Sequence, residues 1–99
     1  MQIEYLAVAQ RDLIDISGYY RDIGGGQLAR KMVAKIKSEI IVLADYSGAA
    51  PFYEIASNVR RLVVAGGAYL VFYRVMQHVQ ILHIRRGERA PAIAEDISN

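Results

Sequence analysis

The sequence contains no cysteine and no long apolar run in its 99 residues. Without cysteine, the chain cannot form a disulfide framework, a thiolate zinc site or a cysteine nucleophile. No stretch approaches the roughly 18–20 apolar residues of a membrane span. The opening MQIEYLAVAQRDLID includes acidic residues and lacks the apolar core of a signal peptide. We therefore expect a soluble, cytoplasmic protein with no membrane partner.

Residues suited to catalysis or metal binding are also scarce. The only imidazoles are His78 and His83, and no cysteine or paired carboxylates accompany them, so we expect no metal site. The glycine run at 24–26 lacks the Gly-Lys-Ser/Thr continuation of a phosphate-binding loop, and no serine lies in a nucleophile elbow. We expect no cofactor. His83 has two interpretations: a general acid–base group beside arginines, or a structural histidine with its hydrogen bonds satisfied.

Lysine is scarce relative to arginine, with three lysines against nine arginines in a chain of formal net charge +2. Arginine presents a planar fork of donors that fits phosphate or carboxylate, whereas lysine acts more as a point charge. Six arginines lie in the last 40 residues: Arg60, Arg61, Arg74, Arg85, Arg86 and Arg89. This clustering indicates an anionic partner. The alternative for each single arginine is solvation or pairing with a nearby acidic side chain.

The first half of the chain has the apolar period of helices. A short strand is expected at residues 2–6, and a helix follows because one apolar stripe recurs at helical spacing, formed by Ala9, Leu13, Ile16 and Tyr20. The glycines at 24–26 should end this helix. A second stripe predicts another helix from residue 28 to about residue 44, and the short link predicts an antiparallel helical hairpin. Residues 45–58 are expected to form a loop.

The second half has the period of a sheet. We expect strands at 59–65, 68–76 and 79–86, joined by a tight Gly66-Gly67 hairpin and a turn at 77–78. Strict alternation groups Leu70, Phe72, Arg74 and Met76 on one face of the middle strand, and Val79, Ile81, His83 and Arg85 on one face of the last.

The predicted fold is a single α+β domain over residues 1–99. Its element order is β-α-α-β-β-β. The antiparallel helical hairpin packs on one face of a mostly antiparallel sheet, which the N-terminal strand joins. The other face stays exposed, where function is expected.

Three stretches, in this order, resemble the RelE/ParE superfamily of bacterial toxins. AQRDLIDISGYYRD is similar to the opening helix of the family, with its Ala-x-x-Asp-Leu-x-x-Ile-x-x-Tyr pattern at Ala9, Asp12, Leu13, Ile16 and Tyr19. VRRLVVAGGAYLVFYRV leads into the Tyr-Arg-Val signature at Tyr73, Arg74 and Val75, and VQILHIRRGER is similar to the last strand and its basic end. The resemblance implies a RelE-like fold.

The resemblance also bears on activity, because the superfamily divides into two branches. RelE-like members are ribosome-dependent messenger-RNA endonucleases, and they commonly carry an arginine four residues before the signature arginine. This sequence has Leu70 there, and it has Glu88 where those enzymes carry a tyrosine or a histidine. The ParE-like branch, associated with inhibition of DNA gyrase, needs no catalytic set. We therefore expect a ParE-like toxin without catalytic residues, which blocks gyrase and replication.

The resemblance implies two protein partners, a cognate antitoxin and DNA gyrase. The candidates for target binding are Arg60, Arg61, Arg74, His83, Arg85, Arg86 and Arg89. The antitoxin is expected to dock on the apolar surface of Leu70, Phe72 and Met76, or on the exposed side of the helical hairpin. Two alternatives stay open. One is a ribonuclease acting on messenger RNA at the ribosome through His83, Arg85 and Arg86, and the other is a non-toxic family member that serves only as a binding module.

Overall fold

The computed structural model describes residues 1–87, and it confirms an α+β fold. Four strands form one mixed sheet in the order β1-β4-β3-β2, with bounds β1 (Ile3–Tyr5), β2 (Arg60–Val64), β3 (Tyr69–Val75) and β4 (Val79–Arg86). The β2–β3 and β3–β4 pairs are antiparallel, and β1 joins the edge of β4 in parallel. The predicted participation of the N-terminal strand is confirmed.

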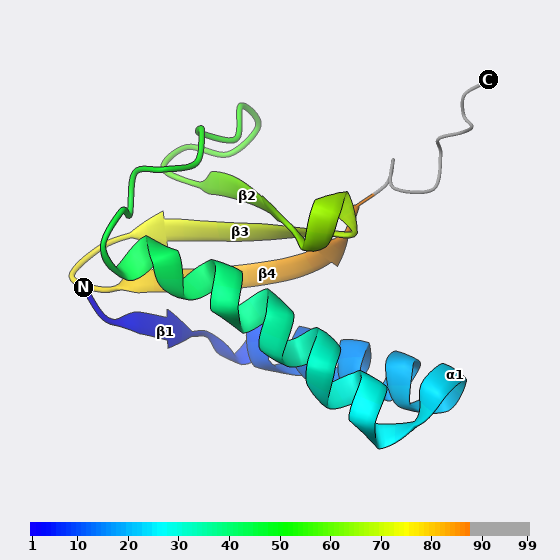
Figure 1. Ribbon diagram of the computed structural model, residues 1–99. Helices are drawn as coiled ribbons and strands as arrows, with labels where there is room; N and C mark the ends of the chain where they lie inside the picture. The colour runs from blue at the N-terminus through cyan, green and yellow to red at the C-terminus, as the bar shows by residue number, and fades with distance from the viewer. Residues whose placement is uncertain (88–99) are drawn as a thin grey trace.

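The helical layer is α1 (Ala7–Ile40), whose two helical halves meet at a kink. Its backbone leaves helical geometry at Gly25, where φ is 89°, a value that glycine adopts without a steric penalty. Figure 1 shows α1 reversing direction at its far end, so that its second half returns along the sheet beside the first. The helix gives way to a short 3₁₀ helix, η1 (Ile41–Ala44), just before the predicted end at residue 44.

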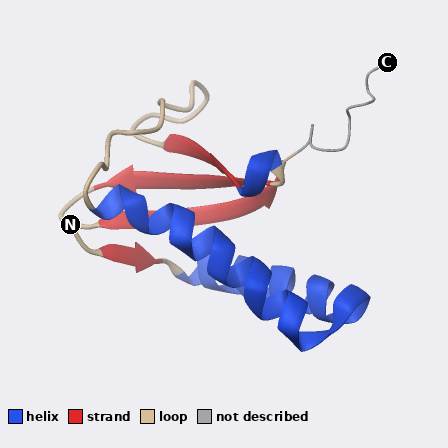
Figure 2. Cartoon of the chain, in the orientation of Figure 1, coloured by secondary structure: helices blue, strands red, loops and turns tan. Residues whose placement is uncertain are grey.

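The core lies between α1 and one face of the sheet, as the separation of helices and strands in Figure 2 illustrates. Three residues of the predicted stripe, Ala9, Leu13 and Ile16, are buried, and the fourth, Tyr20, packs partly buried against the same core. They meet Ile36 and Ile40 from the returning half of α1 and Leu43 from η1. The sheet contributes the buried side chains of Val64, Tyr69, Val71, Tyr73, Val79, Ile81 and Ile84. Burying these apolar surfaces is the dominant favourable contribution to folding.

A β-bulge corrects the predicted faces of the last strand. Pairing runs Phe72↔His83 and then Tyr73↔Ile81, so Leu82 is an extra residue in β4. An extra residue shifts the alternation by one. As a result Val79 and Ile81 are buried together with Ile84, not with His83. The single-face grouping of Val79, Ile81, His83 and Arg85 was therefore wrong.

The turn between β2 and β3 also differs from the expected two-residue hairpin. A short 3₁₀ helix, η2 (Ala65–Gly67), connects the strands, and Ala65, Gly66 and Gly67 all have positive φ. Across from it, a Cβ atom on Gly87 would overlap the carbonyl oxygen of Gly67. Glycine is thus required at residue 87 by a close backbone approach.

Two further features can be checked over residues 1–87. In this part of the chain no helix combines the length and the apolarity of a membrane span. Nor do three or more potential metal-binding side chains gather anywhere within it.

Candidate functional site

The candidate site is the face of the sheet that α1 does not cover, which we call the open face. Cross-strand pairing defines it. Val63, Leu70 and Arg85 form one row, and Arg61, Phe72 and His83 form the next. Beyond the bulge, Arg74 pairs with Gln80, which pairs with Glu4 of β1. Figure 1 shows α1 on the opposite side of the strands. The bulge is what brings His83 and Arg85 to this face.

Three of the predicted target-binding arginines, Arg61, Arg74 and Arg85, lie on the open face together with His83. Arg61 and Arg85 are exposed, and the Arg61 guanidinium lies 5.7 Å from the centre of the Tyr53 ring. Within residues 1–87 the ion pairs are Lys35–Glu39 and His83–Asp12, so none of these arginines has a carboxylate partner there. Within residues 1–87 their positive charge is therefore not neutralised by an ion pair.

Arg74 is held in a polar row across three strands. Its Nε donates to Gln80 Oε1 at 2.7 Å, and Gln80 Nε2 donates to Glu4 Oε1 at 3.2 Å. These bonds fix the side chain while engaging only one of its nitrogens. The two terminal nitrogens of Arg74 make no hydrogen bond to any residue from 1 to 87.

Arg60 and Arg86, two further target-binding candidates, lie away from the open face. Arg60 pairs with buried Tyr73 in the sheet and donates from Nη1 to the Ala50 carbonyl at 2.7 Å, which ties down the 45–59 loop. Arg86 pairs with Tyr69 in the sheet, on the side that faces α1. Its guanidinium carbon lies 5.0 Å from the centre of the Tyr19 ring. Contact with the Tyr19 hydroxyl raises the pKa of Arg86. Arg89 falls outside the described residues.

His83 is oriented by a carboxylate that sequence reasoning did not select. Asp12 Oδ2 lies 3.0 Å from His83 Nδ1 and also accepts a hydrogen bond from the Ile84 backbone N–H at 2.9 Å. Asp12 can reach the edge of β4 because β1 is short and pairs with β4 only from Val79 to Ile81. Beyond it the edge of β4 has no strand neighbour, and α1 supplies Asp12 instead. A carboxylate that orients an imidazole is the usual support of a general base.

The predicted antitoxin residues on β3 are only partly available. Leu70 and Phe72 are half-buried on the open face. Tyr53 packs edge-on against Phe72 with ring centres 5.0 Å apart, and Arg85 lies across from Leu70. Met76, just beyond the strand, is 58% exposed.

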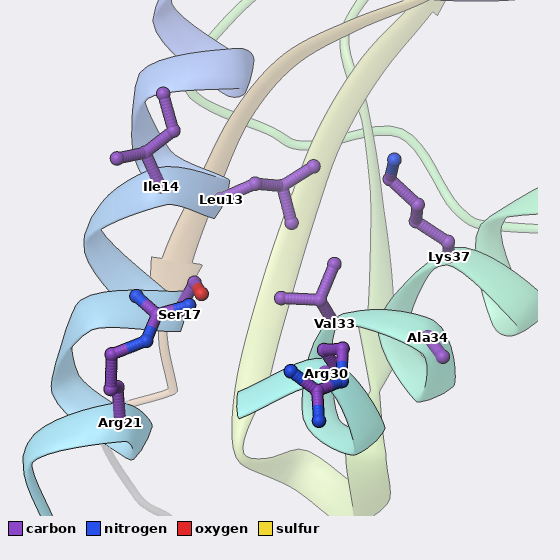
Figure 3. A pocket seen from close by; sticks show the side chains of 8 residues that line it. All are labelled: Leu13, Ile14, Ser17, Arg21, Arg30, Val33, Ala34 and Lys37. Atoms are coloured by element: carbon purple, nitrogen blue, oxygen red, sulfur yellow. The ribbon is translucent and has the colours of Figure 1, made fainter. Parts of the chain in front are cut away.

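A second apolar surface lies between the two halves of α1, and we call it the helix groove. It is a hollow of about 580 Å³. Figure 3 shows Leu13 and Val33 directed toward each other from the two halves, with Arg21 and Arg30 on opposite sides of the groove at one end. Lys37 adds a third cation, and Ile14, which also lines the groove, is 69% exposed. The groove therefore has an apolar floor and a cationic rim.

Comparison with known proteins gives a consistent result. The sequence matches the family model "ParE toxin of type II toxin-antitoxin system, parDE" over residues 3–91. A solved structure described as "Chromosomal ParDE TA system from P. aeruginosa" contains a similar chain, with a TM-score of 0.77 and 28% identity, covering 87% of this chain and 95% of that one. No curated protein matches.

Proposed function

The chain belongs to the ParE toxin family of type II toxin–antitoxin systems, and on this basis we propose that it inhibits DNA gyrase until a cognate antitoxin neutralises it. The cell compartment of that activity is the cytoplasm. The observation that carries the target proposal is the open face, where Arg61, Arg74 and Arg85 lack carboxylate partners within residues 1–87.

The charge of the open face suits gyrase engaged with DNA, which is an anionic target. Exposed arginines raise the rate of encounter with such a target and fix its orientation. The polar row through Gln80 and Glu4 holds Arg74 in place before binding. A side chain that is already ordered loses less entropy when it binds.

The helix groove is the better of the two predicted antitoxin surfaces. An amphipathic helix binds by laying its apolar side into a groove, and Leu13, Ile14 and Val33 line one. Acidic residues along the edges of that helix would face Arg21, Arg30 and Lys37. The alternative surface on β3 is smaller, because Tyr53 already covers part of Phe72.

Two variants with the same loss of charge test both assignments together. R61Q/R74Q/R85Q removes three cations from the open face, and R21Q/R30Q/K37Q removes three from the groove. We expect the first to lose inhibition of gyrase supercoiling and to keep antitoxin binding, and the second to do the reverse. Growth arrest on expression without the antitoxin should follow the supercoiling result.

The outcomes separate the proposals. Normal supercoiling at a large excess of folded wild-type protein would overturn gyrase inhibition. Equal losses for both variants in both assays would show that overall charge, and not a particular surface, controls binding. Expression without an antitoxin that leaves growth unchanged would favour a family member that acts only as a binding module.

A ribonuclease is the second candidate, because Asp12 orients His83 on a face that carries Arg85. In such a reaction His83 Nε2 would take the proton of a ribose 2′-hydroxyl while its oxygen attacks phosphorus. The 5′-oxygen would then leave with a proton from the imidazolium, giving a 2′,3′-cyclic phosphate and a 5′-hydroxyl. Arg85, across from Leu70, would stabilise the extra negative charge.

Cleavage of messenger RNA on translating ribosomes tests this second candidate. Loss of a general base lowers such a rate by about 100-fold or more, so His83→Ala should lower cleavage by that factor. Asp12→Asn should also lower it while leaving the ring in place. The gyrase proposal remains first, since Leu70 stands where the ribonuclease branch carries its guanidinium. Ribosomes that release intact messenger RNA in the presence of wild-type protein would remove the ribonuclease.

A further inference from the structure

A third surface, separate from the helix groove, is the hollow between the 45–59 segment and the end of β3, which we call the loop pocket. Its volume is about 640 Å³, within the usual range of small-molecule sites. The lining residues that matter here are Ser47, Phe52, Ser57, Asn58, Arg60 and Arg74. It contains hydroxyl, amide and guanidinium groups, and among residues 1–87 no carboxylate lines it.

The two arginines of the loop pocket are held by neutral acceptors and not by acids. Arg60 bonds to the Ala50 carbonyl, and Arg74 bonds through Nε to the amide oxygen of Gln80. Neither takes part in an ion pair with any of the first 87 residues. Two ordered guanidinium groups with uncompensated charge favour a phosphate, which they bind by charge-assisted hydrogen bonds.

Phe52 provides a flat apolar surface at the same hollow. The Arg60 guanidinium stacks 3.8 Å from its ring centre, yet the residue is 60% exposed. Its ring is fixed in position by Arg60 and by the bridge between residues 52 and 60. An aromatic ring held open to solvent beside cations is the arrangement that stacks nucleobases in nucleic-acid-binding proteins.

Asn58 lies at the pocket with φ of 61°, in the left-handed region that side chains seldom adopt. Such conformations recur at ligand sites. The backbone of the segment is nevertheless well anchored. Tyr53 N–H donates to the Val59 carbonyl at 2.7 Å, and Tyr73 Oη donates to the Ser47 carbonyl at 2.9 Å. The pocket is thus formed before a ligand arrives.

We propose that the loop pocket binds a nucleotide, with its phosphate at Arg60 and Arg74 and its base against the Phe52 ring. The same chemistry is offered by a free nucleoside monophosphate and by a nucleotide at the end of a single strand. The loop pocket shares Arg74 with the open face but lies at the other end of β3 from the Leu70–Arg85 row. Its test measures ligand binding to the isolated protein, so the result does not depend on gyrase inhibition.

Amide NMR titration of the labelled protein with AMP, adenosine and inorganic phosphate tests the site directly. AMP should shift amide signals of residues 47–60 and 74–76. Binding of adenosine or phosphate alone should be weaker by about 10-fold or more, since each lacks one half of the contacts. Arg60 is left intact in these tests because it anchors the loop.

Arg74→Gln is the decisive variant and Arg61→Gln is its matched control. Both remove one cation from the sheet, but Arg61 does not line the pocket. Arg74→Gln should weaken AMP binding by about 10–100-fold, the factor expected for a lost charge-assisted hydrogen bond. Arg61→Gln should change it by less than about 3-fold, as expected of an exposed charge at a distance. Phe52→Leu should abolish the preference for AMP over phosphate.

Two dinucleotides, with and without a 5′-phosphate, distinguish the sources of the ligand. If only the phosphorylated one binds, and more tightly than AMP, the pocket takes a strand end; if AMP binds equally well, it takes a free nucleotide. The proposal is overturned if neither AMP nor the phosphorylated dinucleotide shifts the pocket amides at millimolar concentration. It is also overturned if Arg74→Gln and Arg61→Gln weaken binding equally.

Discussion

Replacing Asp12 with alanine removes the only side chain that satisfies the free edge of β4 near its end in the described structure. Asp12 Oδ2 accepts the Ile84 N–H at 2.9 Å and contacts His83 Nδ1 at 3.0 Å. The aspartate side chain is only 19% exposed, so water replaces it poorly. After the change, the Ile84 N–H would be left without its protein acceptor.

The magnitude follows from two opposing contributions. A hydrogen bond to a charged group stabilises a fold by about 1.5–3 kcal/mol. Alanine returns roughly 0.6 kcal/mol, because it favours the helix more than aspartate does. The His83 contact adds little, since that side chain is 42% exposed. We therefore expect Asp12→Ala to lower the free energy of unfolding by about 1–2 kcal/mol, equivalent to about 5–15 °C in Tm for a domain of this size.

Circular dichroism during thermal and urea unfolding measures this loss, with Asp15→Ala as the control. Asp15 is exposed, lies one turn further along α1 and carries the same charge, so its removal should cost less than about 0.5 kcal/mol. Asp12→Asn keeps an acceptor and should fall between the two. Amide exchange at Ile84 should accelerate in Asp12→Ala. If Asp12→Ala and Asp15→Ala unfold within about 0.5 kcal/mol of each other, the edge of β4 does not depend on this carboxylate.

Three further predictions concern the sheet. Tyr73→Phe removes the hydroxyl that bonds residues 47 and 50, so it should cost about 1–2 kcal/mol and speed proteolysis of that loop; unchanged cleavage would contradict it. Gly87→Ala forces a methyl group against the Gly67 carbonyl, and thermal unfolding should show a loss of about 1–3 kcal/mol. Burial raises the pKa of Tyr69 to about 12 from its usual 10.0. Its neutral form therefore stabilises the fold below pH 10, and that contribution is lost between pH 10 and 12. The alkaline decline of Tm should be shallower in Tyr69→Phe, and an identical decline would exclude this residue as its source.

The periodicity of apolar residues was sufficient to predict the helices and strands and the side of the core that α1 contributes. The apolar stripe at Ala9, Leu13 and Ile16 is buried as expected, and β4 has the predicted bounds of 79–86. Both patterns are local, and burial against a single partner layer enforces them. The order of the helices and strands was enough to predict the α+β fold class, because it follows from the same local patterns.

The open face could not be predicted in full because it depends on the bulge at Leu82. An extra residue in one strand leaves no mark on apolar spacing when its neighbours are also apolar. Strict alternation therefore placed His83 with buried Ile81, although His83 pairs with Phe72 on the other face. Asp12 was missed for a related reason. It is separated from His83 by 71 residues, and its one visible signal was its place in the Ala-x-x-Asp-Leu pattern of the opening helix.

Leu70 alone does not describe the charge of its row on the open face. Its lack of charge was the reason to expect a protein that binds without cutting, yet Arg85 lies directly across from it on β4. A guanidinium can thus reach the same row from the neighbouring strand. The identity of residue 70 therefore ranks the two activities, and variants of His83, Asp12 and Arg85 test that ranking.

The positions of the two main surfaces also constrain how an antitoxin would act. The helix groove belongs to the α1 layer, whereas Arg61, Arg74 and Arg85 lie on the far side of the sheet. A helix that only fills the groove leaves those arginines accessible. Neutralisation by blocking the target surface would therefore require a further antitoxin segment that passes the edge of the sheet. If an antitoxin binds in the groove and gyrase is still inhibited, the inhibiting surface must lie outside the groove, as the open face does.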